Sequence, residues 1–212
     1  MTIAVFGASG AIGKLLVKKA LNDGYKVKAY VRNPKKIDFS HPNLTVVKGE
    51  LNEYEKMKNF IRETDTVIST LGPSMDRNAT GTPVLDGHVN IIKAMENEKK
   101  SRFITLATPS VKFEKDKKST TTVLSVIIGK IFIPKRGLEE MKSIGDTVRS
   151  SNLDWTIVRI LAPVNDDTSS DVKVTFGDKK IKWKISRKNI ASFMLDQVKD
   201  SKYIKSMPII GS

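Results

Sequence analysis

In the segment Val5-Phe6-Gly7-Ala8-Ser9-Gly10-Ala11-Ile12-Gly13, three spaced glycines separate an apolar stretch of sequence from an amphipathic stretch. Gly7 permits a tight turn, and Gly10 lets the backbone approach a pyrophosphate because no Cβ stands in the way. Gly13 allows the following helix to lie close to the preceding strand. The segment therefore predicts a strand, a phosphate-binding turn, and a helix whose N-terminal N–H groups face an anion.

Beyond this segment, short apolar runs alternate with amphipathic stretches, which is typical of βαβ units and a parallel sheet. We expect strands at 2–6, 26–31, 44–47, 66–71, 102–108, 155–160 and 207–210. Helices are expected from residue 12, around 54–61, and at 83–97, 135–149 and 188–198. Because crossovers between parallel strands are right-handed, the fold class is α/β: a doubly wound, mostly parallel Rossmann sheet in a single domain over residues 1–212.

Two parts of the chain depart from this alternation. Residues from about 163 onward are expected to form a small substrate-side region, in which 172–176 and 181–185 flank Gly177-Asp178 as in a hairpin or loose antiparallel excursion. The stretch 110–134 is lysine-rich at first and apolar at its end, and its pattern fixes no conformation. A lid over the bound ligand is a hypothesis for this stretch, which slower proteolysis in the presence of the ligand would support.

The composition is that of an ordinary globular protein of 212 residues, with 39% hydrophobic residues and enough length for one sizeable core. There is no cysteine, so neither a disulfide framework nor a thiolate metal site is available. Because the chain has 2 histidines, His41 and His88, no imidazole-built metal site is expected. Asp166, Asp167 and Asp171 form an acidic cluster, for which a solvated loop is a simpler interpretation than a metal site.

The formal net charge of +14 raises the question of nucleic acid as a partner. The excess is mainly lysine spread along the whole chain, and aromatic residues do not interleave with it as a stacking platform requires. A solvated basic surface is the preferred interpretation, so nucleic acid is not the expected partner.

The longest apolar stretch, 123–133, is interrupted and too short to span a bilayer core of ~30 Å. The sequence also runs directly from Met1 into an apolar strand, without a basic leader. We therefore expect a cytoplasmic protein without membrane contact, either a monomer or a homodimer, whose partner is a small-molecule acceptor.

The end of the second expected strand reads Val31-Arg32-Asn33-Pro34. Domains that prefer NAD usually carry an acidic residue at this place for the ribose 2′-hydroxyl. Here a guanidinium stands where a carboxylate is usual, which suits a bidentate contact to a 2′-phosphate. Ser9 could add a hydroxyl contact to the same group. The sequence therefore predicts NADP(H) as the cofactor, while an ordinary surface cation is the alternative for Arg32.

With these residues, the chain resembles the atypical short-chain dehydrogenases/reductases, and within them the small NAD(P)H-binding proteins related to NmrA-like proteins and to flavin reductases of the biliverdin reductase B type. The resemblance extends over nearly the whole chain. It rests on the glycine loop and the second-strand end quoted above, and on Gly49-Glu50-Leu51, Ser69-Thr70-Leu71-Gly72, Asp154-Trp155-Thr156-Ile157-Val158-Arg159 and Ile185-Ser186-Arg187-Lys188-Asn189-Ile190-Ala191.

The resemblance implies a set of cofactor-binding residues. Glu50 and Leu51 would lie against the adenine, where relatives carry a Gly-Asp pair. The segment Thr70-Leu71-Gly72 would line the ribose and the nicotinamide, and Pro163 would pass near the carboxamide. With the glycine loop, the expected cofactor site comprises Gly7, Ser9, Gly10, Ala11, Ile12, Gly13, Arg32, Glu50, Leu51, Thr70, Leu71, Gly72 and Pro163.

Most short-chain dehydrogenases use a tyrosine, and a lysine four residues later, on the helix after the fifth strand to move a proton. Tyr54 and Lys58 have this spacing but follow the third expected strand, and the helix expected at 135–149 contains no tyrosine. An easily reduced acceptor can take its proton from solvent, because the cofactor carries the hydride chemistry. Relatives use a Ser or Thr at the end of the fifth strand, so Thr108 and Ser110 are the expected catalytic groups, with loop capping as the alternative.

Two functions from different classes follow from these residues. The first is an NADPH-dependent oxidoreductase that reduces a small planar acceptor, of the quinone or flavin type, by hydride transfer. The second is a non-catalytic NADP(H)-sensing regulatory protein that binds a protein partner, as some NmrA-like proteins are thought to do. The missing tyrosine favours the second function, and the small size of the chain favours the first.

Overall fold

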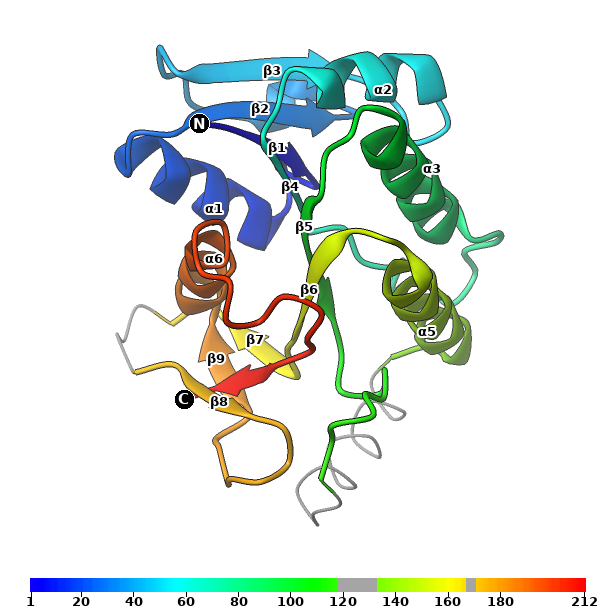
Figure 1. Cartoon of the computed structure of the whole chain (residues 1–212), viewed down its shortest axis with the longest axis vertical. Coiled ribbons are helices and arrows are strands. Elements are labelled where there is room, and N and C mark those ends of the chain that lie inside the picture. The colour runs from blue at the N-terminus through cyan, green and yellow to red at the C-terminus, as the bar shows by residue number, and fades with distance from the viewer. Residues whose placement is uncertain (118–132, 167–170) are drawn as a thin grey trace.

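The computed structural model describes residues 1–117, 133–166 and 171–212 (Figure 1). Residues 118–132, which make up most of the stretch considered as a lid, and Asp167 of the acidic cluster lie outside the described residues. No described helix combines the length and the apolar character that a membrane span requires.

One eight-stranded sheet runs through the fold, in the order β3-β2-β1-β4-β5-β6-β10-β8. Its strands are β1 (Thr2–Phe6), β2 (Lys26–Val31), β3 (Leu44–Lys48), β4 (Thr66–Ser69), β5 (Arg102–Ala107), β6 (Asp154–Arg159), β8 (Lys173–Thr175) and β10 (Ile209–Gly211). Neighbouring strands pair in parallel, except that β10 and β8 pair antiparallel. The order reverses between β1 and β4, and such a reversal leaves a crevice where α/β proteins bind ligands.

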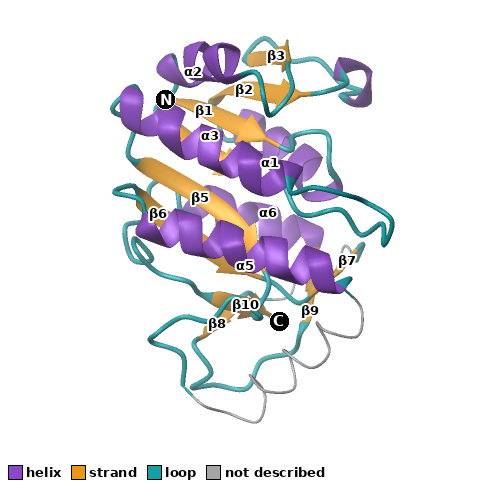
Figure 2. Ribbon diagram, turned by 90° about the vertical axis from the view of Figure 1, so that its right-hand side faces the viewer, coloured by secondary structure: helices purple, strands orange, loops and turns teal. Residues whose placement is uncertain are grey.

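Helices cover both faces of this sheet (Figure 1 and Figure 2). The helices α1 (Ala11–Asn22) and α6 (Arg187–Asp196) pack together on one face. The other face carries α2 (Tyr54–Arg62), α3 (Pro83–Asn97) and α5 (Lys135–Ser150). Each face buries its own apolar cluster, one between α1, α6 and the sheet and one under the other three helices. The expected doubly wound, mostly parallel α/β domain is therefore confirmed.

The hairpin expected around Gly177-Asp178 is wrong, because the two segments that flank this turn do not pair with each other. A turn does form there, with Gly177 at φ 87° and the Asp178 carboxylate accepting from the Phe176 N–H at 2.9 Å. However, β8 pairs antiparallel with β10, while β9 (Lys184–Ser186) pairs in parallel with β7 (Ala162–Val164) in a separate two-stranded sheet. The buried strand β10 gives β8 a partner inside the main sheet, so β8 does not fold back on β9.

Candidate functional site

The glycine loop connects β1 to α1 at the crevice. Gly7 has φ 75°, a conformation that L side chains rarely adopt, and its carbonyl oxygen accepts from the Gly10 N–H at 2.9 Å. A Cβ on Gly13 would lie 2.2 Å from that same oxygen, so only glycine lets α1 approach β1 this closely. Gly10 is the N-cap residue of α1, and among the described residues no side chain caps the helix there. The first N–H groups of α1, including those of Ala11 and Ile12, thus face outward at the positive end of the helix dipole.

Thr70 joins the glycine loop to the end of β4. Its N–H donates to the carbonyl oxygen of Phe6 at 3.0 Å, and its hydroxyl donates to the carbonyl oxygens of Phe6 at 3.2 Å and Gly7 at 3.1 Å. All three bonds cross from β4 to β1, the two strands between which the strand order reverses. The loop backbone is therefore held in place by a residue outside the loop.

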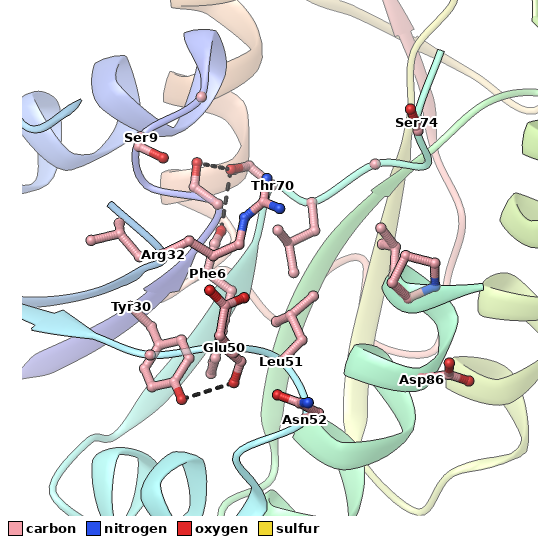
Figure 3. A pocket seen from close by; sticks show the side chains of 18 of the residues that line it. Phe6, Ser9, Tyr30, Arg32, Glu50, Leu51, Asn52, Thr70, Ser74 and Asp86 are labelled. Atoms are coloured by element: carbon pink, nitrogen blue, oxygen red, sulfur yellow. Dashed lines mark hydrogen bonds between the residues drawn. The ribbon is translucent and has the colours of Figure 1, made fainter. Parts of the chain in front are cut away.

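A cleft of about 920 Å³ opens at this point (Figure 3). Its walls come from the glycine loop, the end of β2, the segments that follow β3 and β4, and the first turn of α3. The lining residues are Phe6, Gly7, Ser9, Gly10, Tyr30, Val31, Arg32, Lys36, Gly49, Glu50, Leu51, Asn52, Thr70, Leu71, Gly72, Ser74, Pro83, Val84 and Asp86. The volume is in the upper part of the range of roughly 300–1,000 Å³ for ligand pockets, so the cleft can hold an extended ligand.

The structure brings most of the expected cofactor residues together in this cleft. Those that line it are Gly7, Ser9, Gly10, Arg32, Glu50, Leu51, Thr70, Leu71 and Gly72. The other three loop residues, Ala11, Ile12 and Gly13, begin α1 directly behind the lining. Pro163 lies in β7, which pairs with β9, and it is not among the described residues that line the cleft.

Ser9 and Arg32 lie at one end of the cleft (Figure 3). Arg32 is exposed, and within the described ranges it has no ion-pair partner. The Asn33 side chain accepts from the Lys35 N–H at 3.0 Å and begins the 3₁₀ helix η1 (Pro34–Lys36), which brings the exposed Lys36 to the same cleft. These two cations and the Ser9 hydroxyl of the lining suit an anionic group such as a phosphate.

Tyr30 lines the cleft, although no sequence motif singled it out. Its ring lies against Gly49, where a Cβ would come within 2.2 Å of the ring, and its hydroxyl donates to the carbonyl oxygen of Glu50 at 3.1 Å. Burial, and to a lesser extent the Glu53 and Glu50 carboxylates, raise the pKa of Tyr30 to about 12. The phenol therefore keeps its proton at physiological pH and orients the segment after β3 as a hydrogen-bond donor.

The start of α3 forms the opposite end of the cleft, with Ser74 and Asp86 far from Ser9 (Figure 3). Asn90 on α3 donates from Nδ2 to the carbonyl oxygen of Leu51 at 2.9 Å, which ties the segment after β3 to this helix. No residue of this wall was among the predicted site residues. A signal was present, because a proline at a first helical position marks a helix N-terminus after the fourth strand, at the crevice of a doubly wound sheet.

The two expected catalytic residues lie together but do not line the cleft. Thr108 directly follows β5, Ser110 is buried, and their hydroxyl oxygens are 2.6 Å apart. Strand β5 pairs with β4, so Thr108 and Ser110 follow the strand next to the one that Thr70 follows. In the described part of the chain, neither hydroxyl bonds to a histidine, a lysine or a carboxylate. The rejected tyrosine, Tyr54, accepts at its hydroxyl from the Asn97 side chain at 2.6 Å and does not line the cleft.

His88 on α3 is fully buried against β4 and β5. Its Nδ1 lies 2.8 Å from the carbonyl oxygen of Val84, and its Nε2 lies 3.2 Å from Ser69 Oγ and 3.3 Å from Thr105 Oγ1. Since a carbonyl oxygen only accepts, Nδ1 carries the proton and Nε2 accepts from the hydroxyls. Burial lowers the pKa of His88 from 6.5 to about 4. The imidazole is therefore neutral at physiological pH.

The low pKa of His88 predicts a loss of stability in mild acid. Between pH 6.5 and pH 4 the unfolded chain takes up a proton at His88 that the folded chain does not bind, so falling pH favours unfolding. Protonation of His88 in the unfolded chain is expected to lower the free energy of unfolding by about 2 kcal/mol between pH 7.5 and pH 5. Urea unfolding of the wild type and of His88→Gln at both pH values measures it. Equal losses in the two proteins would show that His88 does not cause the effect.

Comparison with known proteins places this geometry in a family. The NAD(P)H-binding family matches residues 7–201. Curated relatives include isoeugenol synthase 1 of Clarkia breweri, 31% identical over 83 residues that cover 34% of this chain and 26% of that protein. Cinnamoyl-CoA reductase 1 of Arabidopsis thaliana is 31% identical over 112 residues, which cover 49% of this chain and 33% of that protein. The aligned parts thus span a third or less of these relatives.

Solved structures share the fold over the whole chain. A short-chain dehydrogenase/reductase of Veillonella parvula superposes with a TM-score of 0.82 at 18% identity, covering 100% of this chain and 94% of that one. A second structure of a Veillonella parvula short-chain dehydrogenase/reductase, in complex with NADP, has a TM-score of 0.79 at 19% identity, with 100% and 94% coverage. Since the family match takes in the glycine loop and every strand from β2 to β9, this chain belongs to the NAD(P)H-binding family and has the fold of the short-chain dehydrogenases/reductases.

Proposed function

We propose that this chain is an NADPH-dependent oxidoreductase that reduces a small planar acceptor, of the quinone or flavin type, by hydride transfer. The observation that carries the proposal is the cleft at the β1–β4 reversal, with an uncapped helix start beside it and the cations Arg32 and Lys36 in its lining. Relatives named as a cinnamoyl-CoA reductase and an isoflavone reductase homolog support a reductase. The solved neighbour in complex with NADP supports the phosphorylated cofactor.

The residues of the cleft fit a dinucleotide with a 2′-phosphate. The glycine loop and the first N–H groups of α1 would hold the pyrophosphate, where no side chain competes for them. Arg32 would hold the 2′-phosphate in a bidentate contact, helped by Ser9 and Lys36. Following the family resemblance, Glu50 and Leu51 would lie at the adenine, and the segment 70–72 would line the ribose and the nicotinamide.

When bound, the reduced cofactor supplies one hydride, and the acceptor takes one further proton from solvent, so a quinone leaves as a hydroquinone. The protein binds and orients the two reactants. Helix α5 carries no tyrosine to deliver a proton, which favours acceptors whose reduction needs no protein acid. The Thr108 and Ser110 hydroxyls, adjacent to the cleft in the sheet order, would hydrogen-bond the acceptor.

A non-catalytic NADP(H)-sensing protein with a protein partner is the second candidate. One observation favours it: Thr108 and Ser110 bond to each other and lie outside the cleft lining, so the cleft itself presents no proton-transfer pair. Binding of NADP(H) without turnover of any acceptor would distinguish this function from the first.

Paired calorimetric titrations with NADPH and NADH on the wild type and Arg32→Ala test the cofactor. NADPH is expected to bind more tightly to the wild type, and the substitution is expected to remove about 1.5–3 kcal/mol of that preference, the usual contribution of a hydrogen bond to a charged group. Lys35→Ala is the matched control, because Lys35 is an exposed cation three positions away that does not line the cleft. Equal affinities for both nucleotides in the wild type would contradict the assignment of NADP(H).

Consumption of NADPH in the presence of quinones and flavins, followed at 340 nm, tests the reaction once binding is measured. Turnover with a planar acceptor supports the reductase. Tight binding without turnover supports the sensor. If neither nucleotide binds, the cleft serves another ligand and both proposed functions are wrong.

A further inference from the structure

The connection between β4 and α3 lines the cleft, and in its middle the Arg136 guanidinium on α5 donates to the carbonyl oxygen of Ala79. Gly72 and Ser74 are exposed members of the lining, and the residues from 75 to 78 are exposed as well. At its two ends, the half-buried residues Leu71 and Val84 line the cleft from the β4 side and the α3 side. The shape of this wall therefore depends on what holds these two residues as well as on the bond to Ala79.

A chain of hydrogen bonds through His88 joins the two ends. The Leu71 N–H donates to Ser69 Oγ at 3.4 Å, and the Ser69 hydroxyl donates to His88 Nε2 at 3.2 Å. On the other side of the ring, His88 Nδ1–H donates to the carbonyl oxygen of Val84 at 2.8 Å. Both ring nitrogens are thus used, one toward each end of the connection.

Glu140 on α5 fixes the same turn from the opposite side. Its Oε1 accepts from the N–H groups of Val84 at 2.9 Å and Leu85 at 3.1 Å, and its side chain is buried. It takes the place of a local cap, since the N-cap residue Thr82 makes no side-chain capping bond. Val84 is therefore held at its N–H by Glu140 and at its carbonyl by His88.

We infer that His88 is a positioning residue for the nucleotide cleft, which holds Leu71 and Val84 at a fixed separation and so sets the width of the wall between β4 and α3. The inference rests on the proposed function, because it takes the cleft as the NADP(H) site. His88 does not line the cleft and has no direct contact with a nucleotide in this role. An apolar side chain would fill the same buried space, yet it would leave both ends of the connection unlinked.

Three variants separate the two halves of the link. His88→Asn retains a donor near the place of Nδ1, for Val84. His88→Gln retains an acceptor near the place of Nε2, for Ser69 and Thr105, and His88→Leu removes both. We expect His88→Leu to weaken NADPH binding by about tenfold, the effect of roughly one lost buried hydrogen bond, and each amide to restore part of the affinity.

Met95→Ala is the matched control for a general loss of stability. Met95 is fully buried on α3, two turns beyond His88, and does not line the cleft. Its truncation is expected to lower the unfolding temperature while the affinity for NADPH stays within twofold. If His88→Leu binds NADPH as tightly as the wild type, or if Met95→Ala loses as much affinity, the positioning role is wrong.

Amide hydrogen exchange without nucleotide gives a second readout, which does not depend on the proposed function. In His88→Leu the hydrogen-bonded amides of Leu71, Val84 and Leu85 are expected to exchange at least tenfold faster, whereas in Met95→Ala of comparable stability they are not. If the wild type fails to bind NADPH but the two variants still differ in amide exchange, the proposed function is wrong and the link through His88 is supported. Unchanged exchange in His88→Leu would overturn the inference.

Discussion

Gly13→Ala is expected to lower the free energy of unfolding by about 3 kcal/mol and to abolish nucleotide binding, which makes it among the most damaging single-methyl changes in this chain. The new Cβ would lie 2.2 Å from the carbonyl oxygen of Gly7 and 2.8 Å from the Cα of Ala8. Both atoms belong to the backbone, so no side chain can move aside. Helix α1 would have to shift away from β1, and the N–H groups at its start would move with it.

Gly10→Ala in the same loop is the control for this prediction. Its Cβ would meet no atom closer than the Gly7 carbonyl oxygen at 3.2 Å, and its φ of −77° is ordinary for alanine. We expect a much smaller loss of stability than in Gly13→Ala, because a shift of a few tenths of an ångström relieves the 3.2 Å contact, and weaker binding of NADPH, because Gly10 lines the cleft. Urea unfolding and calorimetry on both variants measure the two effects separately. Wild-type stability in Gly13→Ala would refute the close approach of α1 to β1.

Asp116→Ala is expected to lower the free energy of unfolding by about 3–5 kcal/mol, since it leaves the buried charge of Arg159 without its partner. The guanidinium of Arg159 is fully buried and donates from Nη1 and Nη2 to the two carboxylate oxygens of Asp116, at 2.7 and 2.5 Å. It also donates from Nε to the carbonyl oxygen of Met207 at 2.8 Å and from Nη1 to that of Val111 at 3.1 Å. These backbone acceptors cannot neutralise the cation.

Asp38→Ala is the control for the ion pair. The Asp38 side chain is 64% exposed and pairs with Lys14 at 3.0 Å, so its removal is expected to change stability little. Thermal and urea unfolding of both variants provide the comparison. The double variant Asp116→Ala/Arg159→Met should recover much of the loss, because it removes the unpaired charge. Equal stabilities of Asp116→Ala and Asp38→Ala would show that the buried pair contributes nothing.

The part of the site nearest the N-terminus could be predicted because its determinants are local. The glycine spacing and the residue that ends β2 each act within a few positions of the chain, and the structure places Gly7, Gly10 and Arg32 together in the cleft. Their assignment to NADP(H) remains a proposal. The doubly wound, mostly parallel sheet was equally accessible, since crossover handedness restricts how βαβ units can be joined.

The remaining features depend on partners distant in the chain. Tyr30 reads as an ordinary strand aromatic, and only Gly49 and Glu50 of the next strand's end show why it faces the cleft. The partner of β8 is β10, more than thirty residues later, so the turn at Gly177-Asp178 gave the wrong pairing. Glu140 looks like a surface helix residue, yet it caps α3 across 56 residues.

The bonds from Thr70 to the glycine loop also bear on how this protein folds. They close a loop of 63 and 64 residues, and contacts so far apart in sequence form late, after the loop entropy has been lost. A nascent chain that ends before β4 lacks Thr70, so the bonds that hold the turn between β1 and α1 cannot yet form. The nucleotide-binding turn therefore takes its final form only after β4 has joined the sheet. A bound nucleotide then stabilises the finished protein chiefly by slowing its unfolding.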